Sequence, residues 1–325
     1  MLRHPPLGLL LLLTCSAWPS GAAATPSVTA RAEVPTLAAE VSAPLLPTLR
    51  RMPSAEAALR AVLRQEQPLV LGLGEYHQRE GQRALPSSLH RFIRQLLPRL
   101  ARRTSDLVIE TWITDGSCGA REQQVVSDVA QTIKRPARTE DEILTLVKRA
   151  QRYRIRPQIL TLSCGEYERL LAPGAVDYAG LLALTASKLR DKVEALVRLR
   201  TDPARRAVDD ALRGFSGSGA GGRDLILVYG GALHNELHPT PDNANLSYAP
   251  AVSRAAGDHY VELDLFVPEY IEEHDSLLRE EAWFPLFERA SSPSHTLLIQ
   301  RAARSYVIIF PRQRPARGGP RRAPG

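Results

Sequence analysis

Two short phrases of the same form, a glycine followed three positions later by a histidine, carry the clearest chemical signal in this chain. They are Gly74-Glu75-Tyr76-His77 and Gly231-Ala232-Leu233-His234. An imidazole changes charge near neutral pH, so it can act as a general base or bind a metal ion. A carboxylate beside His77 can orient the ring and raise its basicity. We therefore expect His77 and His234 to be catalytic, with Glu75 as partner; for His77, a histidine that caps a helix or bonds a loop carbonyl is the alternative.

Glu110 is the third candidate, because it ends a run of apolar residues at 107–109. A carboxylate that follows buried residues is costly unless it is paired, protonated or bound to a metal ion. An ion pair with one of the many arginines is the structural alternative. Together, His77, Glu110 and His234 could hold a divalent metal such as manganese, cobalt or zinc. One coordination position would then stay open for a water molecule.

Each candidate lies at the end of a short apolar run, which is typical of a buried strand. The runs are residues 68–73, 106–110 and 224–230. Ligands of open α/β sheets bind at the carboxyl ends of the strands. The candidates are therefore expected at one edge of one sheet.

The remaining pattern predicts the α/β class, with a mostly parallel sheet built from βαβ units and flanked by helices. Further strands are expected near residues 158–162 and 259–265, a helical insertion at about 165–222, and a C-terminal β-hairpin at 296–310. We expect a single α/β domain over residues 48–311.

Both ends of the chain differ from this domain. Residues 1–24 have the basic start, apolar run and small-residue end of a secretory signal peptide, so we expect export to the periplasm or the extracellular space. A lipoprotein anchor at Cys15 is the alternative, although Thr14 stands where a smaller residue is expected. Residues 25–47 resemble a linker, and residues 312–325 a disordered basic tail. No further stretch reaches the ~20 apolar residues of a transmembrane helix.

The net charge of +7 is concentrated at the ends of the chain. Subtracting Arg3 and the five arginines of the tail leaves +1 for everything else. No nucleic-acid-binding motif accompanies the charge, so we expect no nucleic-acid partner. The oligomeric state is not encoded in any pattern that we recognise.

Outside the predicted signal peptide the chain has two cysteines, Cys118 and Cys164. An even number of cysteines in an exported chain favours a disulfide bond. Both follow predicted strand ends, so we expect a bond that joins two loops at the functional edge; two buried free thiols are the alternative.

The order of these residues resembles a superfamily that groups Tiki proteases, TraB proteins, erythromycin esterases and ChaN-like haem-binding proteins. Leu73-Gly74-Glu75-Tyr76-His77 is similar to the Leu-Gly-Glu-x-His form of the esterase and ChaN-like branches. The doubled Gly-x-x-His with Glu110 between resembles the Tiki and TraB branches. The resemblance spans roughly residues 65–270. It implies an α/β fold whose catalytic edge carries Glu75, His77, Glu110 and His234.

We therefore expect an exported hydrolase of ester or amide bonds that acts on a small-molecule or peptide substrate. His77 would be the general base or a metal ligand, and His234 would hold the metal or stabilise the substrate oxyanion. The alternative is a haem- or cofactor-binding, ChaN-like envelope protein without catalysis, with Tyr76 or a histidine as axial ligand. Gln78 follows His77 where ChaN-like proteins tend to have a second histidine close by. A third possibility is an inactive scaffold.

Overall fold

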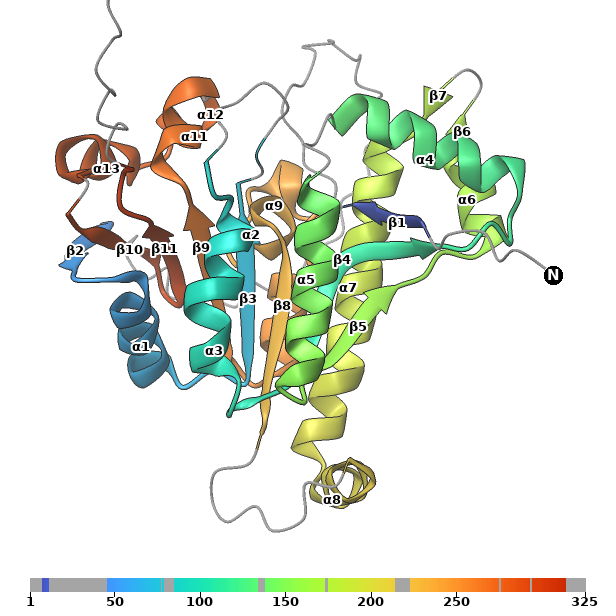
Figure 1. Ribbon diagram of the computed structural model, residues 1–325, viewed down its shortest axis with the longest axis horizontal. Coiled ribbons are helices and arrows are strands. Elements are labelled where there is room, and N and C mark those ends of the chain that lie inside the picture. The colour runs from blue at the N-terminus through green and yellow to red at the C-terminus, as the bar shows by residue number, and fades with distance from the viewer. Residues whose placement is uncertain are drawn as a thin grey trace, which may run out of the picture.

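The fold is a sheet with helices on both faces (Figure 1). The computed structural model describes residues 8–11, 46–76, 78, 85–133, 138–172, 175–213, 223–274, 276–292 and 294–313. The predicted signal peptide, linker and basic tail lie largely outside these residues. Strands and helices alternate along much of the described chain, which confirms the predicted α/β class.

The sheet has nine described strands. They are β1 (Gly8–Leu11), β2 (Thr48–Met52), β3 (Val70–Glu75), β4 (Thr104–Thr114), β5 (Arg156–Leu160), β8 (Leu225–Gly231), β9 (Tyr260–Phe266), β10 (Thr296–Ala302) and β11 (Ser305–Ile309). Parallel pairs join β5 to β4, β4 to β8, β8 to β3, β3 to β9 and β9 to β11. β10 pairs antiparallel with β11, as the predicted hairpin requires, and also with β2.

The central strands are buried on both faces, which explains why their sequences are nearly continuous apolar runs. β3 lies between β8 and β9, two strands that come much later in the chain. The connection after β3 covers one face of the sheet, and the connection after β8 covers the other. In open α/β sheets, ligands bind at the carboxyl ends of neighbouring strands whose connections diverge in this way.

One face of the sheet is covered by helices whose apolar sides carry Leu59, Phe92 and Leu146. These helices are α1 (Ala55–Glu66), the consecutive segments α2 (Ser88–Arg91), η1 (Phe92–Leu96) and α3 (Leu97–Leu100), and α5 (Arg138–Arg152). η1 is a π-helical turn, and Pro98 falls in the first turn of α3, where a missing N–H is tolerated. α1 begins after Ser54, whose hydroxyl accepts a hydrogen bond from the Ala57 N–H at 3.2 Å.

The other face is covered by a second group of helices. They are α4 (Ala120–Ile133), α6 (Cys164–Leu170), α7 (Tyr178–Thr201) and α10 (Ala249–Ala255). A small hairpin, β6 (Leu171–Ala172) and β7 (Ala175–Val176), joins α6 to α7. A third apolar cluster packs α13 (Phe284–Ala290) against β9, β10 and β11, next to α11 (Pro268–His274) and α12 (Ser276–Arg279). No described helix has the length and apolar character needed to cross a membrane.

β4 extends further than the sequence predicted. The strand was expected to end at Glu110, but it continues through Thr111, Trp112 and Ile113 to Thr114. β-Branched and aromatic residues favour this extension, and both β5 and β1 pair with this part of the strand. Glu110 therefore lies inside β4 instead of at its end. Glu75 was expected after its strand and is the last residue of β3.

The predicted disulfide bond between Cys118 and Cys164 is confirmed. It joins the loop after β4 to the start of α6 and closes a sequence separation of 46 residues. Glu122 orders the same loop, because its carboxylate accepts hydrogen bonds from the Gly116 and Cys118 N–H groups, each at 3.1 Å. The loops after β4 and β5 are thus held together covalently at the carboxyl end of the sheet.

At the amino end of the sheet, a buried ion network joins β4 to α8 (Pro203–Leu212). Asp106 forms ion pairs with Arg156 Nε at 2.7 Å and with Arg213 Nη2 at 3.2 Å. Arg200 Nη1 forms an ion pair with Asp210 at 2.8 Å. Burial by itself would raise the pKa of Asp106, but Arg213 and Arg156 outweigh it and hold that pKa below its ordinary value. The network also includes Asp209, so three carboxylates face three guanidinium groups.

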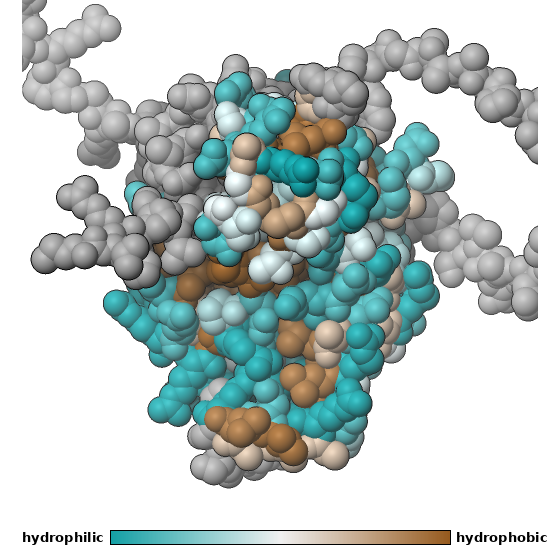
Figure 2. Space-filling view, turned by 90° about the vertical axis from the view of Figure 1, so that its right-hand side faces the viewer, coloured by the Kyte–Doolittle hydropathy of each residue, from teal (hydrophilic) through white to brown (hydrophobic). Residues whose placement is uncertain are grey.

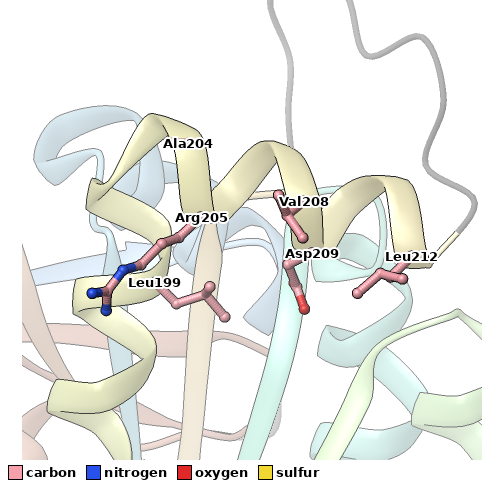
Figure 3. Close-up of a pocket in the computed structure, with 6 residues that line it drawn as sticks. All are labelled: Leu199, Ala204, Arg205, Val208, Asp209 and Leu212. Atoms are coloured by element: carbon pink, nitrogen blue, oxygen red, sulfur yellow. The ribbon is translucent and has the colours of Figure 1, made fainter.

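α8 also forms one wall of a surface hollow of about 470 Å³. Figure 3 shows the lining side chains, which are Leu199, Ala204, Arg205, Val208, Asp209 and Leu212. Val208 and Leu212 are exposed. Figure 2 shows apolar surface at the lower end of the molecule, the end at which α8 lies in Figure 1. The hollow contains no histidine or other nucleophilic side chain and lies at the end of the sheet opposite the predicted site. We assign no chemistry to it.

Candidate functional site

Glu110 and His234 meet at the carboxyl end of the sheet. Glu110 comes from β4, and His234 lies on α9 (Ala232–Asn235), the short helix that directly follows β8. Glu110 Oε1 is 3.6 Å from His234 Nε2, and both side chains are fully buried. The other carboxylate oxygen, Oε2, accepts a hydrogen bond from the Gly231 N–H at 2.7 Å. The start of α9 is therefore bonded to the side chain that faces its histidine.

The hydrogen bond on the far side of the ring assigns the tautomer of His234. Its Nδ1 lies 2.5 Å from the carbonyl oxygen of Leu246, and a carbonyl can only accept, so Nδ1 carries the proton. Burial lowers the pKa of His234 to about 4, and the bond to Leu246 offsets this only in part. The neutral ring therefore points an Nε2 lone pair at Glu110. Nε2 has no hydrogen-bond partner among the described residues.

Glycine at position 230 makes this approach possible. A Cβ atom at Gly230 would lie 2.1 Å from Glu110 Oε2 and 2.8 Å from Glu110 Cβ. A side chain there would push the carboxylate away from His234. The glycine before the second Gly-x-x-His phrase thus makes room for the candidate carboxylate on the neighbouring strand.

Asn235, the neighbour of His234, holds α9 in place. Its amide nitrogen donates to Asp264 Oδ1 at 3.1 Å, and its amide oxygen accepts from the Tyr248 hydroxyl at 3.0 Å and from the Tyr260 hydroxyl. A Cβ atom at Gly72 would lie 1.9 Å from Asn235 Oδ1, so the amide lies directly against β3. α9 has no side-chain cap of its own. These hydrogen bonds therefore position the helix that carries His234.

Two further buried carboxylates, Glu262 and Asp264, lie on β9 beside α9. Arg301 Nη2 binds Asp264 Oδ2 at 2.7 Å and also binds Glu262. Glu262 in turn accepts a hydrogen bond from the Leu237 N–H at 3.1 Å. Burial raises the pKa of Asp264 above its ordinary value, while Arg301 opposes the shift. Burial, together with the negative charge of Glu262, also raises the pKa of the nearby Glu236 to about 7.

Glu75 lies on the opposite face of the sheet from Glu110. Side chains alternate along a strand, and Glu75 follows Leu73 on the side that packs against α1 to α3. There it accepts a hydrogen bond from the Tyr229 hydroxyl at 2.5 Å. Tyr76 is partly buried and packs its ring edge-on against Phe266, with 6.1 Å between the centroids.

His77 falls outside the described residues, so its place relative to Glu75, Glu110 and His234 stays a prediction. Within the part of the chain that the structure describes, no three histidine, cysteine, aspartate or glutamate side chains form a group that could hold a metal ion. Of the four predicted catalytic residues, the structure brings together Glu110 and His234 and places Glu75 on the other face.

Several residues of this region were missed in the sequence, although signals for them exist. Gly72 and Gly74 lie two apart in a strand, a spacing that indicates close approach of other groups to one face. Asn235 contacts that face at Gly72, and a Cβ atom at Gly74 would lie 2.0 Å from Asp264 Oδ1. Glu262 and Asp264 also share one face of an otherwise apolar strand, which marks them as buried carboxylates.

Comparisons with protein-family models, with curated proteins and with solved structures give no match to this chain.

Proposed function

We propose that the protein is a hydrolase of ester or amide bonds whose active site is the carboxyl edge of the sheet around Glu110 and His234. One observation carries the proposal: a fully buried histidine nitrogen without a hydrogen-bond partner among the described residues, 3.6 Å from a carboxylate oxygen. A buried polar atom without a partner is costly, and such groups concentrate at functional sites.

The tautomer of His234 limits what the ring can do. Because Nδ1 donates to Leu246, Nε2 offers a lone pair and no proton. It can accept a proton from a water molecule or bind a cation, but it cannot donate to a substrate oxyanion in this tautomer. Of the two roles expected for His234, the geometry favours electron-pair donation over oxyanion stabilisation.

The donor set also fits a divalent metal ion. Two electron-pair donors, Nε2 of His234 and a carboxylate oxygen of Glu110, face each other, and Oε2 of Glu110 is held by the Gly231 N–H, as ligating carboxylates usually are. Glu110 and His234 would hold the ion, with His77 as the expected third ligand. When bound, such an ion supplies Lewis-acid activation of water. The chain's own contribution is a buried site, a fixed ring tautomer and an oriented carboxylate.

The test is hydrolysis of a panel of activated esters and peptides, together with elemental analysis of protein purified without a metal-affinity tag. We expect His234→Ala, Glu110→Gln and His77→Ala to lower the rate on any cleaved substrate at least ~100-fold. His238→Ala is the matched control, because that ring is exposed and hydrogen-bonds to the Ala303 carbonyl, at 2.9 Å, instead of to Glu110.

Near-stoichiometric manganese, cobalt or zinc that is lost in the first two variants would support the metal-dependent form of the proposal. Cleavage without bound metal would leave a general-base mechanism. Wild-type rates in both His234→Ala and Glu110→Gln would refute the assignment of the site, and a Soret band of stoichiometric haem would favour the cofactor-binding alternative.

A further inference from the structure

The outer half of β4 is a strand edge next to the candidate site. β8 pairs with β4 only as far as the Tyr229 and Ile109 pair, and its last two residues, Gly230 and Gly231, lead into α9. β4 continues for several residues beyond this point, to Thr114. On the side of β4 where β8 has ended, the backbone of residues 111–114 can pair with another strand.

In the full chain, β1 occupies this edge (Figure 1). It pairs antiparallel with β4, with Gly8 opposite Thr114 and Leu11 opposite Thr111. Trp112 pairs with Leu10 on one side and with β5 on the other. β1 therefore takes the position along β4 that β8 would have filled had it continued.

The direction of β1 points it at the candidate site. Since β1 runs from the Thr114 pair to the Thr111 pair, its carboxyl end lies one residue along β4 from Glu110. Glu110 is in turn bonded to Gly231 at the end of β8 and faces His234. A chain that continued beyond the Leu11 position would meet this pair.

We infer that this edge binds an extended, uncharged, apolar peptide segment as an added antiparallel strand. Four of its residues would pair with residues 111–114, and main-chain hydrogen bonds would supply most of the affinity. The apolar character follows from the segment that lies there, Gly-Leu-Leu-Leu, and from Ile113, a partly exposed apolar residue of the edge. Removal of residues 1–24, the predicted signal peptide, would vacate the edge in the exported protein.

The inference rests on the proposed function for what happens next. The peptide bond that follows the residue opposite Thr111 would lie beside Glu110 and His234. Hydrolysis adds one water molecule across that bond and gives a new carboxylate and a new amine. The site is therefore expected to cleave on the carboxyl side of the four paired residues.

The edge can be tested in the full chain by displacing β1. Leu9→Pro/Leu10→Pro removes two backbone N–H groups from β1, whereas Leu9→Ala/Leu10→Ala keeps them. The probe is a fluorescent peptide, Gly-Leu-Leu-Leu flanked by two lysines at each end for solubility. We expect the proline variant to bind it at least about tenfold more tightly than the alanine variant and the wild type, because β1 no longer competes.

A second measurement distinguishes strand addition from simple hydrophobic adsorption. Backbone N–H groups of successive residues in a strand point to opposite sides. N-methylation of the first and third probe residues, or of the second and fourth, should therefore give unequal results. We expect one set to weaken binding at least about tenfold and the other to change it less than about threefold. Equal effects of the two sets, or no binding to the proline variant, would overturn the inference.

These experiments test the peptide-binding site and the proposed hydrolase activity separately. Probe binding with the expected methylation pattern but without cleavage would retain the peptide site and count against the proposed hydrolase. Cleavage of esters without peptide binding at this edge would retain the hydrolase and refute the peptide site. Where the probe is cut, mass spectrometry should find the new carboxyl group on the last of the four paired residues.

Discussion

Buried charged side chains are paired differently at the two ends of the sheet. At the amino end, Asp106, Asp209 and Asp210 face Arg156, Arg200 and Arg213, so each carboxylate has a guanidinium partner. At the carboxyl end, Glu262 and Asp264 share the single guanidinium of Arg301, and Glu110 faces a neutral histidine ring. The balanced end fixes the position of α8. The carboxyl end keeps electron-pair donors turned toward one another, an arrangement that suits chemistry better than stability.

The largest effect on folding should come from breaking the balanced network. Asp106→Ala would leave three arginines without their most buried partner, which typically costs about 3–5 kcal/mol. We expect the free energy of unfolding, measured with urea, to fall by that amount. The rate per folded molecule on any cleaved substrate should stay within about twofold of wild type. A large loss of activity at unchanged stability would contradict the contrast between the two ends.

The pH dependence of stability should differ between His234 at the carboxyl end and Asp106 at the amino end. The pKa of His234 is lowered to about 4 from 6.5, so the unfolded state binds a proton between these values and the native state does not. The contribution of His234 to stability should therefore decrease as pH falls from about 6.5 to 4, by up to about 3 kcal/mol, whereas the raised pKa of Glu236 acts in the opposite direction over the same range. Asp106 has a lowered pKa, so its contribution is present above about 4 and is lost only as pH falls further. His234→Gln should remove the contribution of His234 between pH 6.5 and 4 and leave that of Asp106 unchanged, as measured by urea unfolding of the variant and the wild type at a series of pH values.

Glu110→Gln should lower activity and leave stability nearly unchanged, whereas Asp106→Ala should lower stability and leave activity nearly unchanged. The amide can still accept from Gly231 through its oxygen, and its NH₂ group can donate to the lone pair of His234 Nε2. We expect stability within about 1 kcal/mol of wild type and a loss of hydrolysis of at least ~100-fold, equivalent to about 2.7 kcal/mol of transition-state stabilisation. A fall in stability that accounts for the lost activity would make Glu110 a structural residue.

Asn235→Ala probes the positioning of α9 and should have the smallest effect on catalysis of the variants at the candidate site. It removes the acceptor of two tyrosine hydroxyls and the donor to Asp264, which costs about 1–3 kcal/mol of stability. Because His234 would shift with its helix, we expect kcat to fall more than KM changes. Asn235→Asp keeps the acceptor but places a second buried carboxylate beside Asp264, so we expect it to be at least as destabilising as Asn235→Ala at neutral pH. Equal kinetics in Asn235→Ala and wild type would show that α9 is held by other contacts.

Much of the fold could be read from local patterns. Short apolar runs predicted the strands β3 and β8, and the pattern of the C-terminal residues predicted the hairpin of β10 and β11. The even number of cysteines predicted the disulfide bond between Cys118 and Cys164. The end of β4 was predicted wrongly, because the four residues after Glu110 are held in the sheet by pairing with distant segments.

The sequence by itself determined the fold class, the buried strands and the kinds of side chain at their carboxyl ends, because these depend on composition and periodicity over short distances. Only the tertiary structure decided which of those side chains meet. Glu75 and Glu110 look equivalent in the sequence, yet strand alternation turns Glu75 to Tyr229 on one face and Glu110 to His234 on the other. The room for that meeting comes from Gly230 on β8, a strand that lies more than a hundred residues after β4 in the chain. Such a contact depends on register between strands, which no local pattern specifies.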